Sequence, residues 1–171
     1  SAWGRDMAGF RKKGINCLRV GRCPQPDRFY SLADSYGMYI CDRANIDTRL
    51  SRESLQKEGT PANDTLWTTA LIDRVTNMYY ASQNHPSVIM FSLGGRAGRG
   101  YGMYEAYLRL KTIEKNRPVI YEGAGAEWNS DIVIGHPEGR NPSDDRYTLV
   151  FETPESFAGG KAPSAPILEQ A

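Results

Sequence analysis

The chain has 171 residues, of which 40% are hydrophobic and 11% aromatic, an ordinary globular composition that is sufficient for one hydrophobic core. It carries 21 basic and 20 acidic side chains, so its overall charge gives no attraction toward nucleic acid or an anionic membrane surface. No apolar run approaches the roughly 18–20 residues that are needed to cross a bilayer.

Helical and extended segments alternate along the chain. Apolar residues at spacings of three and four, bounded by Gly or Pro, predict helices, and short apolar runs predict strands. In chain order these are a helix end at 7–13, a strand at 15–20, a helix at 26–36, a strand at 38–41, a helix at 64–82, a strand at 88–93, a helix at 101–115 and a strand at 118–121. Residues 131–134 and 147–151 are two further strand candidates. This α/β alternation predicts a parallel sheet covered by helices, either a doubly wound sheet or a closed barrel.

The last third of the chain is poorer in helix signals. Residues 135–145 are rich in Gly, Pro and polar side chains, and they are too few for a full helix in a parallel crossover. Residues 158–171 contain Gly159-Gly160 and two Ala-Pro steps, which predicts a flexible tail after one domain at 1–157.

The cysteine and histidine content argues against a disulfide framework and against a zinc site. The three cysteines, Cys17, Cys23 and Cys41, are an odd number without C-x-x-C spacing. We expect them to be free, buried structural thiols. The two histidines, His85 and His136, lie far apart in the sequence, and we interpret both as structural.

Several stretches resemble the β-galactosidases of glycoside hydrolase family 2. Residues 19–24 read R-V-G-R-C-P and residues 39–49 read Y-I-C-D-R-A-N-I-D-T-R, where the family has R-T-S-H-Y-P and Y-V-x-D-E-A-N-I-E-x-H. Residues 84–94, N-H-P-S-V-I-M-F-S-L-G, resemble N-H-P-S-V-I-x-W-S-L-G-N-E. Residues 117–123 and 131–133 fall where the family has R-P-V-x-Y-E-G and D-I-I.

The resemblance implies a (β/α)8 TIM-barrel-type fold of which this chain supplies about strands two to seven. Such barrels typically need about 250 residues. An unclosed arc would leave two sheet edges open, which soluble proteins avoid. We therefore expect further segments of the same protein, or another chain, to complete the barrel.

The same resemblance implies a retaining glycosidase, which uses two carboxyl groups about 5–5.5 Å apart. Glu152 falls at the position of the nucleophile, and Tyr121 at that of an active-site tyrosine. The general acid/base falls at Arg96, preceded by Gly95 where the family has Asn. A guanidinium stays protonated throughout the physiological pH range, so Arg96 cannot transfer a proton at neutral pH.

Other departures from the family cluster at the same loops. Arg22 stands where the family has His, Arg43 where it has Glu, and Arg49 where it has a second His. In the family the acidic residue at the position of Asp47, the His at that of Arg49 and the acid/base Glu hold magnesium. Because only Asp47 retains an oxygen ligand, we expect the metal site to be lost and no cofactor to be bound.

The arginines allow two interpretations. Singly they fit solvated surface charges, but strand-end positions of a barrel converge on one mouth, where four cations need anions nearby. We expect Asp42, Asp47 and Glu152, or a bound anion, to supply that negative charge. The candidate substrate-binding residues are Asp47, Tyr121, Arg22, Arg49 and Arg96.

Three functions remain open. The first is a β-galactosidase-like barrel domain with impaired or no catalysis, which binds a β-galactoside or another carbohydrate or has a structural role. The second is a working glycosidase whose acid/base comes from elsewhere, such as Glu122, Glu155 or a segment outside this chain. The third is an anion- or nucleic-acid-binding module that uses the arginine-rich mouth, although the balanced charge makes nucleic acid the weaker candidate.

Overall fold

The computed structural model describes residues 2–48, 59–95, 97–125, 127–134 and 148–149. Within these described residues, four α-helices and four strands alternate up to residue 120, and two short strands follow. In chain order the elements are α1 (Ala2–Lys12), β1 (Cys17–Arg19), α2 (Asp27–Tyr36), β2 (Tyr39–Arg43), the 3-10 helix η1 (Pro61–Asn63), α3 (Thr65–Ser82), β3 (Val88–Ser92), α4 (Tyr101–Ile113), β4 (Val119–Ile120), the 3-10 helix η2 (Glu122–Ala124), β5 (Val133–Ile134) and β6 (Thr148–Leu149).

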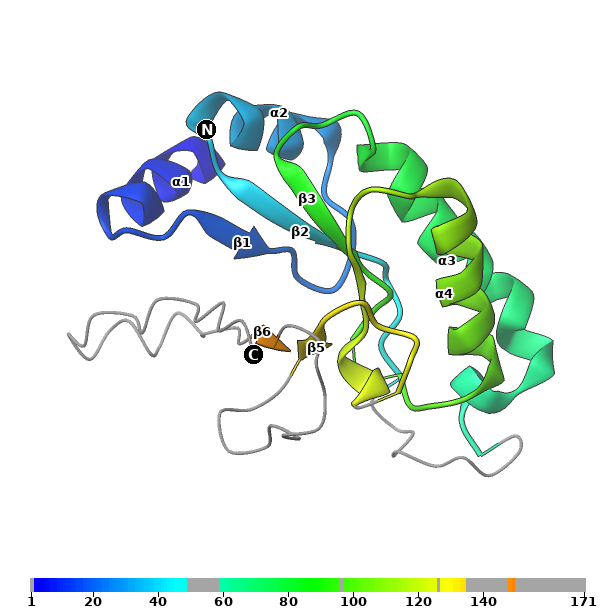
Figure 1. The fold of residues 1–171 in the computed structure, drawn as a ribbon. Coiled ribbons are helices and arrows are strands. Elements are labelled where there is room, and N and C mark those ends of the chain that lie inside the picture. The colour runs from blue at the N-terminus through cyan, green and yellow to red at the C-terminus, as the bar shows by residue number, and fades with distance from the viewer. Residues whose placement is uncertain (1, 49–58, 96, 126, 135–147, 150–171) are drawn as a thin grey trace.

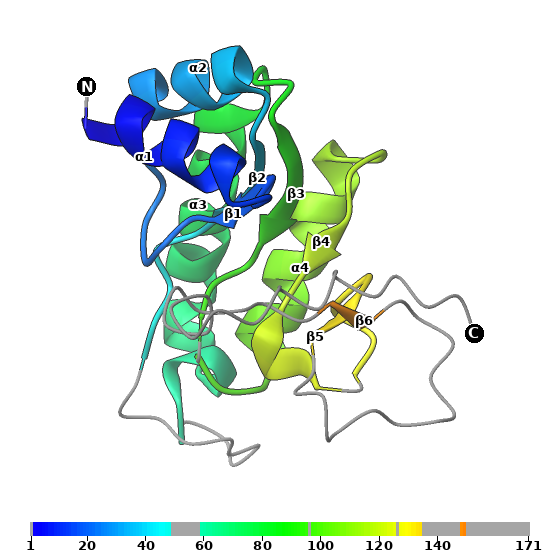
Figure 2. The ribbon, with the colours of Figure 1, turned by 90° about the vertical axis from the view of Figure 1, so that its left-hand side faces the viewer.

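The strands form an open parallel arc with its helices on one side. The main sheet has the order β1-β2-β3-β4, and all three pairings are parallel. In Figure 1 helices α1 to α4 lie on the outer side of this arc, and Figure 2 shows how the strands curve beneath them. This arrangement confirms the predicted α/β fold as part of a TIM-barrel-type sheet. Strands β5 and β6 pair with each other, also in parallel.

All six predicted strands and all four predicted helices are present, with ends that differ by a few residues. Gly37 ends α2 in the left-handed conformation, at φ 64°, which favours glycine. Asp64 precedes α3 and accepts a hydrogen bond from the Leu66 amide at 2.9 Å, which satisfies one of the free donors of the first turn. The crossover at 135–145 and the tail at 158–171 lie outside the described residues.

Alternation along the strands separates two faces of the sheet. Phe91 of β3 packs against Tyr79 of α3, with ring centroids 5.3 Å apart, so it lies on the helix side. Asp42 of β2 pairs in register with Phe91 and lies on that side too, whereas Arg43 points to the opposite, concave face. The core lies between the strands and the helices, and the concave face is left for the polar strand-end residues.

The three cysteines are free, as predicted. Cys41 is buried and Cys17 is half-buried, and burial raises the pKa of both thiols. Cys23 is exposed, which contradicts the expectation that all three thiols are buried. Among the described residues no helix is long and apolar enough to cross a membrane.

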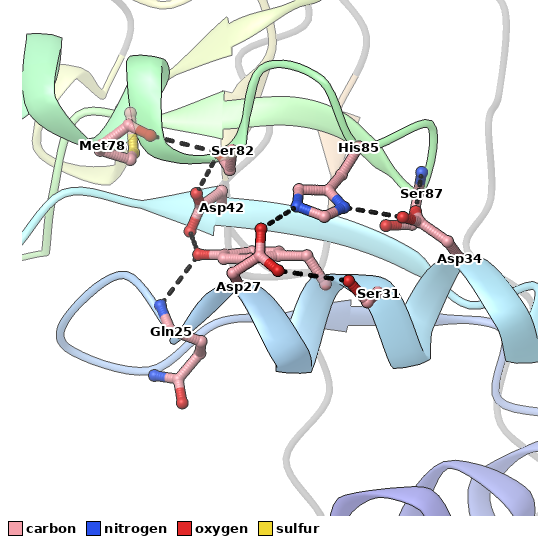
Figure 3. A network of polar contacts seen from close by, with 10 residues as sticks. Gln25, Asp27, Ser31, Asp34, Asp42, Met78, Ser82, His85 and Ser87 are labelled. Carbon is pink, nitrogen blue, oxygen red and sulfur yellow. Dashed lines mark hydrogen bonds and ion pairs between the residues drawn. The ribbon is translucent and has the colours of Figure 1, made fainter.

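A polar network joins α2 to the segments around β2 and β3 (Figure 3). His85 contacts Asp34 through Nδ1 at 2.7 Å and Asp27 through Nε2 at 3.2 Å. The Ser87 amide donates to the other oxygen of Asp34 at 2.9 Å. His85 precedes β3, at the amino ends of the strands, so it lies away from the end where a barrel carries its chemistry. Its contacts support the structural interpretation.

The stability of the chain is expected to decrease from pH 6 to pH 8 because of His85. Burial acts to lower the pKa of His85, but the hydrogen bonds to Asp34 and Asp27 outweigh it and the pKa is raised. A raised folded-state pKa adds stability that is complete below the unfolded value of about 6.5 and is lost as the pH rises through the folded value. Partly exposed ion pairs of this kind contribute on the order of 0.5–1 kcal/mol.

Chemical denaturation of wild type and His85→Gln at both pH values measures this effect. The difference in unfolding free energy between the two proteins should be larger at pH 6 than at pH 8. Asp34→Asn should reduce the same pH dependence, with the contact to Asp27 remaining. A difference that is constant with pH would show that the imidazolium makes no such contribution.

Candidate functional site

The candidate site lies where the four strands of the main sheet end. Backbone hydrogen bonds hold the loops that follow these strands side by side. The Ala44 amide donates to Ser92 O at 3.0 Å, Leu93 to Ile120 O at 2.9 Å, and Gly95 to Ile46 O at 2.8 Å. The loops after β2 and β3 are therefore fixed relative to one another, and the side chains they carry form one rim.

Arg43 fills the space beside Gly95 at the centre of this rim. Arg43 is the last residue of β2 and is only 9% exposed, and Gly95 follows β3 by three residues. A Cβ built on Gly95 would overlap Nη2 of Arg43 and would lie 2.9 Å from its Cζ. The guanidinium therefore occupies the position from which any side chain at residue 95 would start.

A second arginine forms an ion pair that spans the arc. Arg19 at the end of β1 pairs with Glu122, which follows β4. The two strands are the outer members of the four-stranded sheet, so this contact bridges the concave face. Burial lowers the pKa of Arg19, and the positive charge of Arg43 lowers it further. The two guanidinium groups therefore share one site, and Glu122 supplies negative charge to it.

Tyr121 is packed into the same loops. The side chain is 1% exposed, and its hydroxyl donates to the backbone oxygen of Gly98. Its amide donates to Ser130 Oγ at 3.0 Å. These contacts pack the Tyr121 side chain between the loops that follow β3 and β4.

Arg22 and Asp47 lie at the solvent side of the rim. Arg22 Nε is 4.0 Å from Asp47 Oδ2, and the two side chains are 66% and 18% exposed. Thr48 Oγ1 donates to Ala97 O at 3.1 Å and ties the loop after β2 to the loop after β3. Asp47 thus faces a cation, as expected for an acidic residue that neutralises part of the arginine cluster.

Asp42 does not take part in this cluster, contrary to the expectation that it would neutralise the arginines. Its side chain points to the helix side, where Tyr30 Oη donates to Oδ1 at 2.9 Å and Ser82 Oγ donates to Oδ2 at 2.6 Å. Neighbouring residues in a strand face opposite sides, so Asp42 and Arg43 cannot both point into the concave face. The remaining predicted site residues lie outside the described part of the chain, namely Arg49, Arg96 and Glu152, as do His136 and Glu155.

The ion pair of Arg19 with Glu122 and the contact of Arg43 with Gly95 were not foreseen from the sequence. Both join residues that are about 50 to 100 positions apart, and no periodicity links them. One signal was available, because Arg43 and Gly95 both depart from the family pattern and both stand at strand ends. Among the described residues, no three His, Cys, Asp or Glu side chains are grouped so that they could hold a metal ion.

Comparison with known proteins agrees with this fold. Residues 2–146 match the family model described as glycosyl hydrolases family 2, TIM barrel domain. The chain is 35% identical over 130 residues to a β-galactosidase of Vibrio vulnificus (strain YJ016) and 38% identical over 146 residues to one of Enterobacter cloacae. These alignments cover 76% and 85% of this chain but 12% and 14% of the relatives, so the chain spans about an eighth of their length.

Solved structures show the same fold. A β-glucuronidase from Ruminococcus gnavus in complex with D-glucuronic acid superposes with a TM-score of 0.62 at 20% identity, covering 78% of this chain and 23% of that chain. The apo structure of that enzyme superposes with a TM-score of 0.58 and covers 88% of this chain and 24% of its own. The chain belongs to the TIM barrel domain family of the family 2 glycosyl hydrolases.

Proposed function

We propose that this chain is a family 2 barrel domain with impaired or no glycoside hydrolysis, and that it retains a carbohydrate-binding or structural role. One observation carries the proposal: the guanidinium of Arg43 fills the side-chain space of residue 95, next to the position aligned with the acid/base. The sequence places a second guanidinium, Arg96, at that position itself. A permanently protonated group cannot protonate a leaving oxygen and then activate water.

The alternative in which Glu122 acts as the acid/base has less support. Its carboxylate is held by Arg19 in an ion pair across the arc. A carboxylate engaged in this way serves as an acceptor in a fixed contact, whereas a general acid must approach the leaving oxygen of a substrate. The same contact supplies negative charge near Arg19 and Arg43, and so weakens the case for a general anion-binding module.

We also propose that magnesium is not a cofactor of this chain. The positions aligned with the metal ligands carry Asp47, Arg49 and Arg96. Magnesium requires near-octahedral oxygen coordination, and a guanidinium repels the ion instead of coordinating it. The Asp47 carboxylate, the one oxygen ligand left at these positions, lies 4.0 Å from Arg22 Nε. The residues present therefore do not fit the ion.

Further polypeptide is proposed to complete the barrel. The β-galactosidases that this chain resembles are about eight times longer than the aligned region. Strand β1 is an outer strand of the four-stranded sheet, so one of its edges faces away from β2. Parallel sheets are almost always buried on both faces and closed or covered at their edges.

Hydrolysis of an aryl β-galactoside tests the proposed loss of catalysis. The assay uses the longest natural polypeptide that contains this chain. Loss of general acid/base help alone should reduce turnover by about 10²–10⁴-fold relative to an ordinary family member. The double change Gly95→Asn with Arg96→Glu should not restore activity, because Arg43, Arg22 and Arg49 remain. Turnover within about 10-fold of an ordinary member would contradict the proposal.

A further inference from the structure

Arg43 and Gly95 form one steric unit. Because the Arg43 guanidinium overlaps the position of a residue 95 Cβ, the two positions cannot both carry a long side chain in this arrangement. Gly95 has an ordinary backbone φ, unlike Gly94 at +150° and Gly98 at +83°. The space for a side chain at residue 95 is therefore taken by the guanidinium of Arg43, whereas the backbone conformation there would allow one.

The guanidinium also belongs to the residue that ends β2, at the edge of the sheet where TIM-barrel proteins carry their sites. Arg43 ends β2, and the next residue, Ala44, donates to Ser92 O in the rim of loops that follows β2 and β3. Its planar group offers several N–H donors in a rigid fork, which suits oxygen acceptors. Arg19 lies close enough for the two positive charges to influence each other, and Glu122 pairs with Arg19, so the site suits neutral oxygen acceptors better than an anion.

We propose that Arg43 replaces the missing side chain of residue 95 and is the residue that donates hydrogen bonds to sugar oxygens at this site. The inference rests on the carbohydrate-binding role proposed above and assigns the contact with the sugar to one residue, Arg43. The ligand class is a monosaccharide β-glycoside with free hydroxyl groups. Arg43 is a binding residue in this proposal and takes no part in proton transfer.

The steric half of the proposal is tested with the smallest possible side chain. Gly95→Ala in the wild-type chain should lower the melting temperature by about 2–4 °C, because the guanidinium must leave a buried position at a cost of about 1 kcal/mol. In an Arg43→Ala background the same change should cause no loss. Gly21→Ala is the matched control, since a Cβ there would meet nothing within 4 Å. Equal losses in both backgrounds would overturn the steric coupling.

The binding half is tested by titrating methyl β-galactoside and following chemical shifts. Arg43→Ala should weaken binding by about 10-fold or more, since a hydrogen bond from a charged donor contributes about 1.5–3 kcal/mol. Gly95→Ala should weaken binding as well, although it leaves Arg43 chemically intact, because it displaces the guanidinium. The affinity of Arg43→Lys should lie between those of the wild type and Arg43→Ala. Arg109→Ala, on the exposed face of α4, should leave the affinity unchanged.

The outcomes separate this inference from the proposed function. Unchanged binding by Arg43→Ala would overturn the role of Arg43 while leaving carbohydrate binding by the chain intact. No binding by the wild-type chain would overturn both the donor role and the carbohydrate-binding role. Hydrolysis of the glycoside by the wild-type chain, with weaker binding in both variants, would overturn the proposed loss of catalysis and support the role of Arg43.

Discussion

Asp42→Ala is expected to lower the free energy of unfolding by about 3–5 kcal/mol. Asp42 is fully buried, and its Oδ2 accepts a hydrogen bond from Ser82 Oγ at 2.6 Å (Figure 3). Its Oδ1 accepts from Tyr30 Oη at 2.9 Å and from the Arg43 amide at 2.8 Å. Each buried donor that loses its acceptor costs about 1–3 kcal/mol. Urea denaturation of the two proteins measures the difference.

Two further variants define the origin of this loss. Asp42→Asn keeps one oxygen acceptor in nearly the same volume and should cost less than Asp42→Ala. Asp73→Ala is the control, because Asp73 lies on the exposed face of α3 and contacts the neighbouring Asn77 at 3.0 Å. Its effect should stay within about 0.5 kcal/mol. If Asp42→Ala costs no more than Asp73→Ala, the buried network does not stabilise the sheet.

Arg117→Ala should also destabilise the chain by about 3–5 kcal/mol, because it leaves the buried carboxylate of Glu114 without its cation. The Glu114 side chain is 4% exposed, and its Oε2 lies 2.6 Å from Arg117 Nη2. Arg117 also donates to Gln83 O and Val88 O, both at 3.2 Å, and its Cζ lies 4.6 Å from the centroid of the Phe91 ring. The side chain thus connects the end of α4 to the start of β3.

The acid limb of the stability curve gives a second measurement of this pair. Burial acts to raise the pKa of Glu114, but hydrogen bonds from the Arg117 and Asn116 amides and the pairing with the Arg117 guanidinium outweigh it and lower the pKa. A lowered carboxyl pKa contributes stability above the unfolded value of about 4.3, and this is lost as the pH falls through the folded value. Arg117→Ala should reduce that loss.

Arg117→Lys and Arg109→Ala are the matched variants for this pair. Arg117→Lys keeps the charge but not the planar fork, so we expect partial loss. Arg109→Ala removes an exposed arginine of α4 and should change stability little. An Arg117→Ala protein as stable as the Arg109→Ala protein would show that Glu114 does not depend on its partner.

The fold could be predicted from the sequence because its signals are local. The apolar run at Val88–Ser92, bounded by Pro86 and Gly94, leaves few alternatives to a buried strand. Gly37 marks the end of α2 because it takes a left-handed conformation there. The two-residue strands β4 and β5 were also expected, because the apolar pattern and the family resemblance both place a strand after Pro118 and after Asp131.

The candidate site was less predictable because its contacts are long-range. The sequence drew attention to Arg43 and Gly95 as two separate departures from a family pattern, and only the fold brings them into contact. The expectation for Asp42 was wrong because neighbouring residues of a strand face opposite sides, and Arg43 takes the concave face. Its partners Tyr30 and Ser82 belong to helices α2 and α3, and nothing in the pattern of the strand indicates them.

The pleat of β1 determines which of its backbone groups another strand would use. Val20 donates to Cys41 O and Tyr39 donates to Asn16 O, so the even-numbered residues from 16 to 20 direct their amides and carbonyls toward β2. Those of Cys17 and Arg19 point the other way, toward the outer edge. An additional parallel strand must therefore bond to residues 17 and 19, and a shift by one residue would leave it without partners. The edge thus selects the alignment of whatever segment joins it.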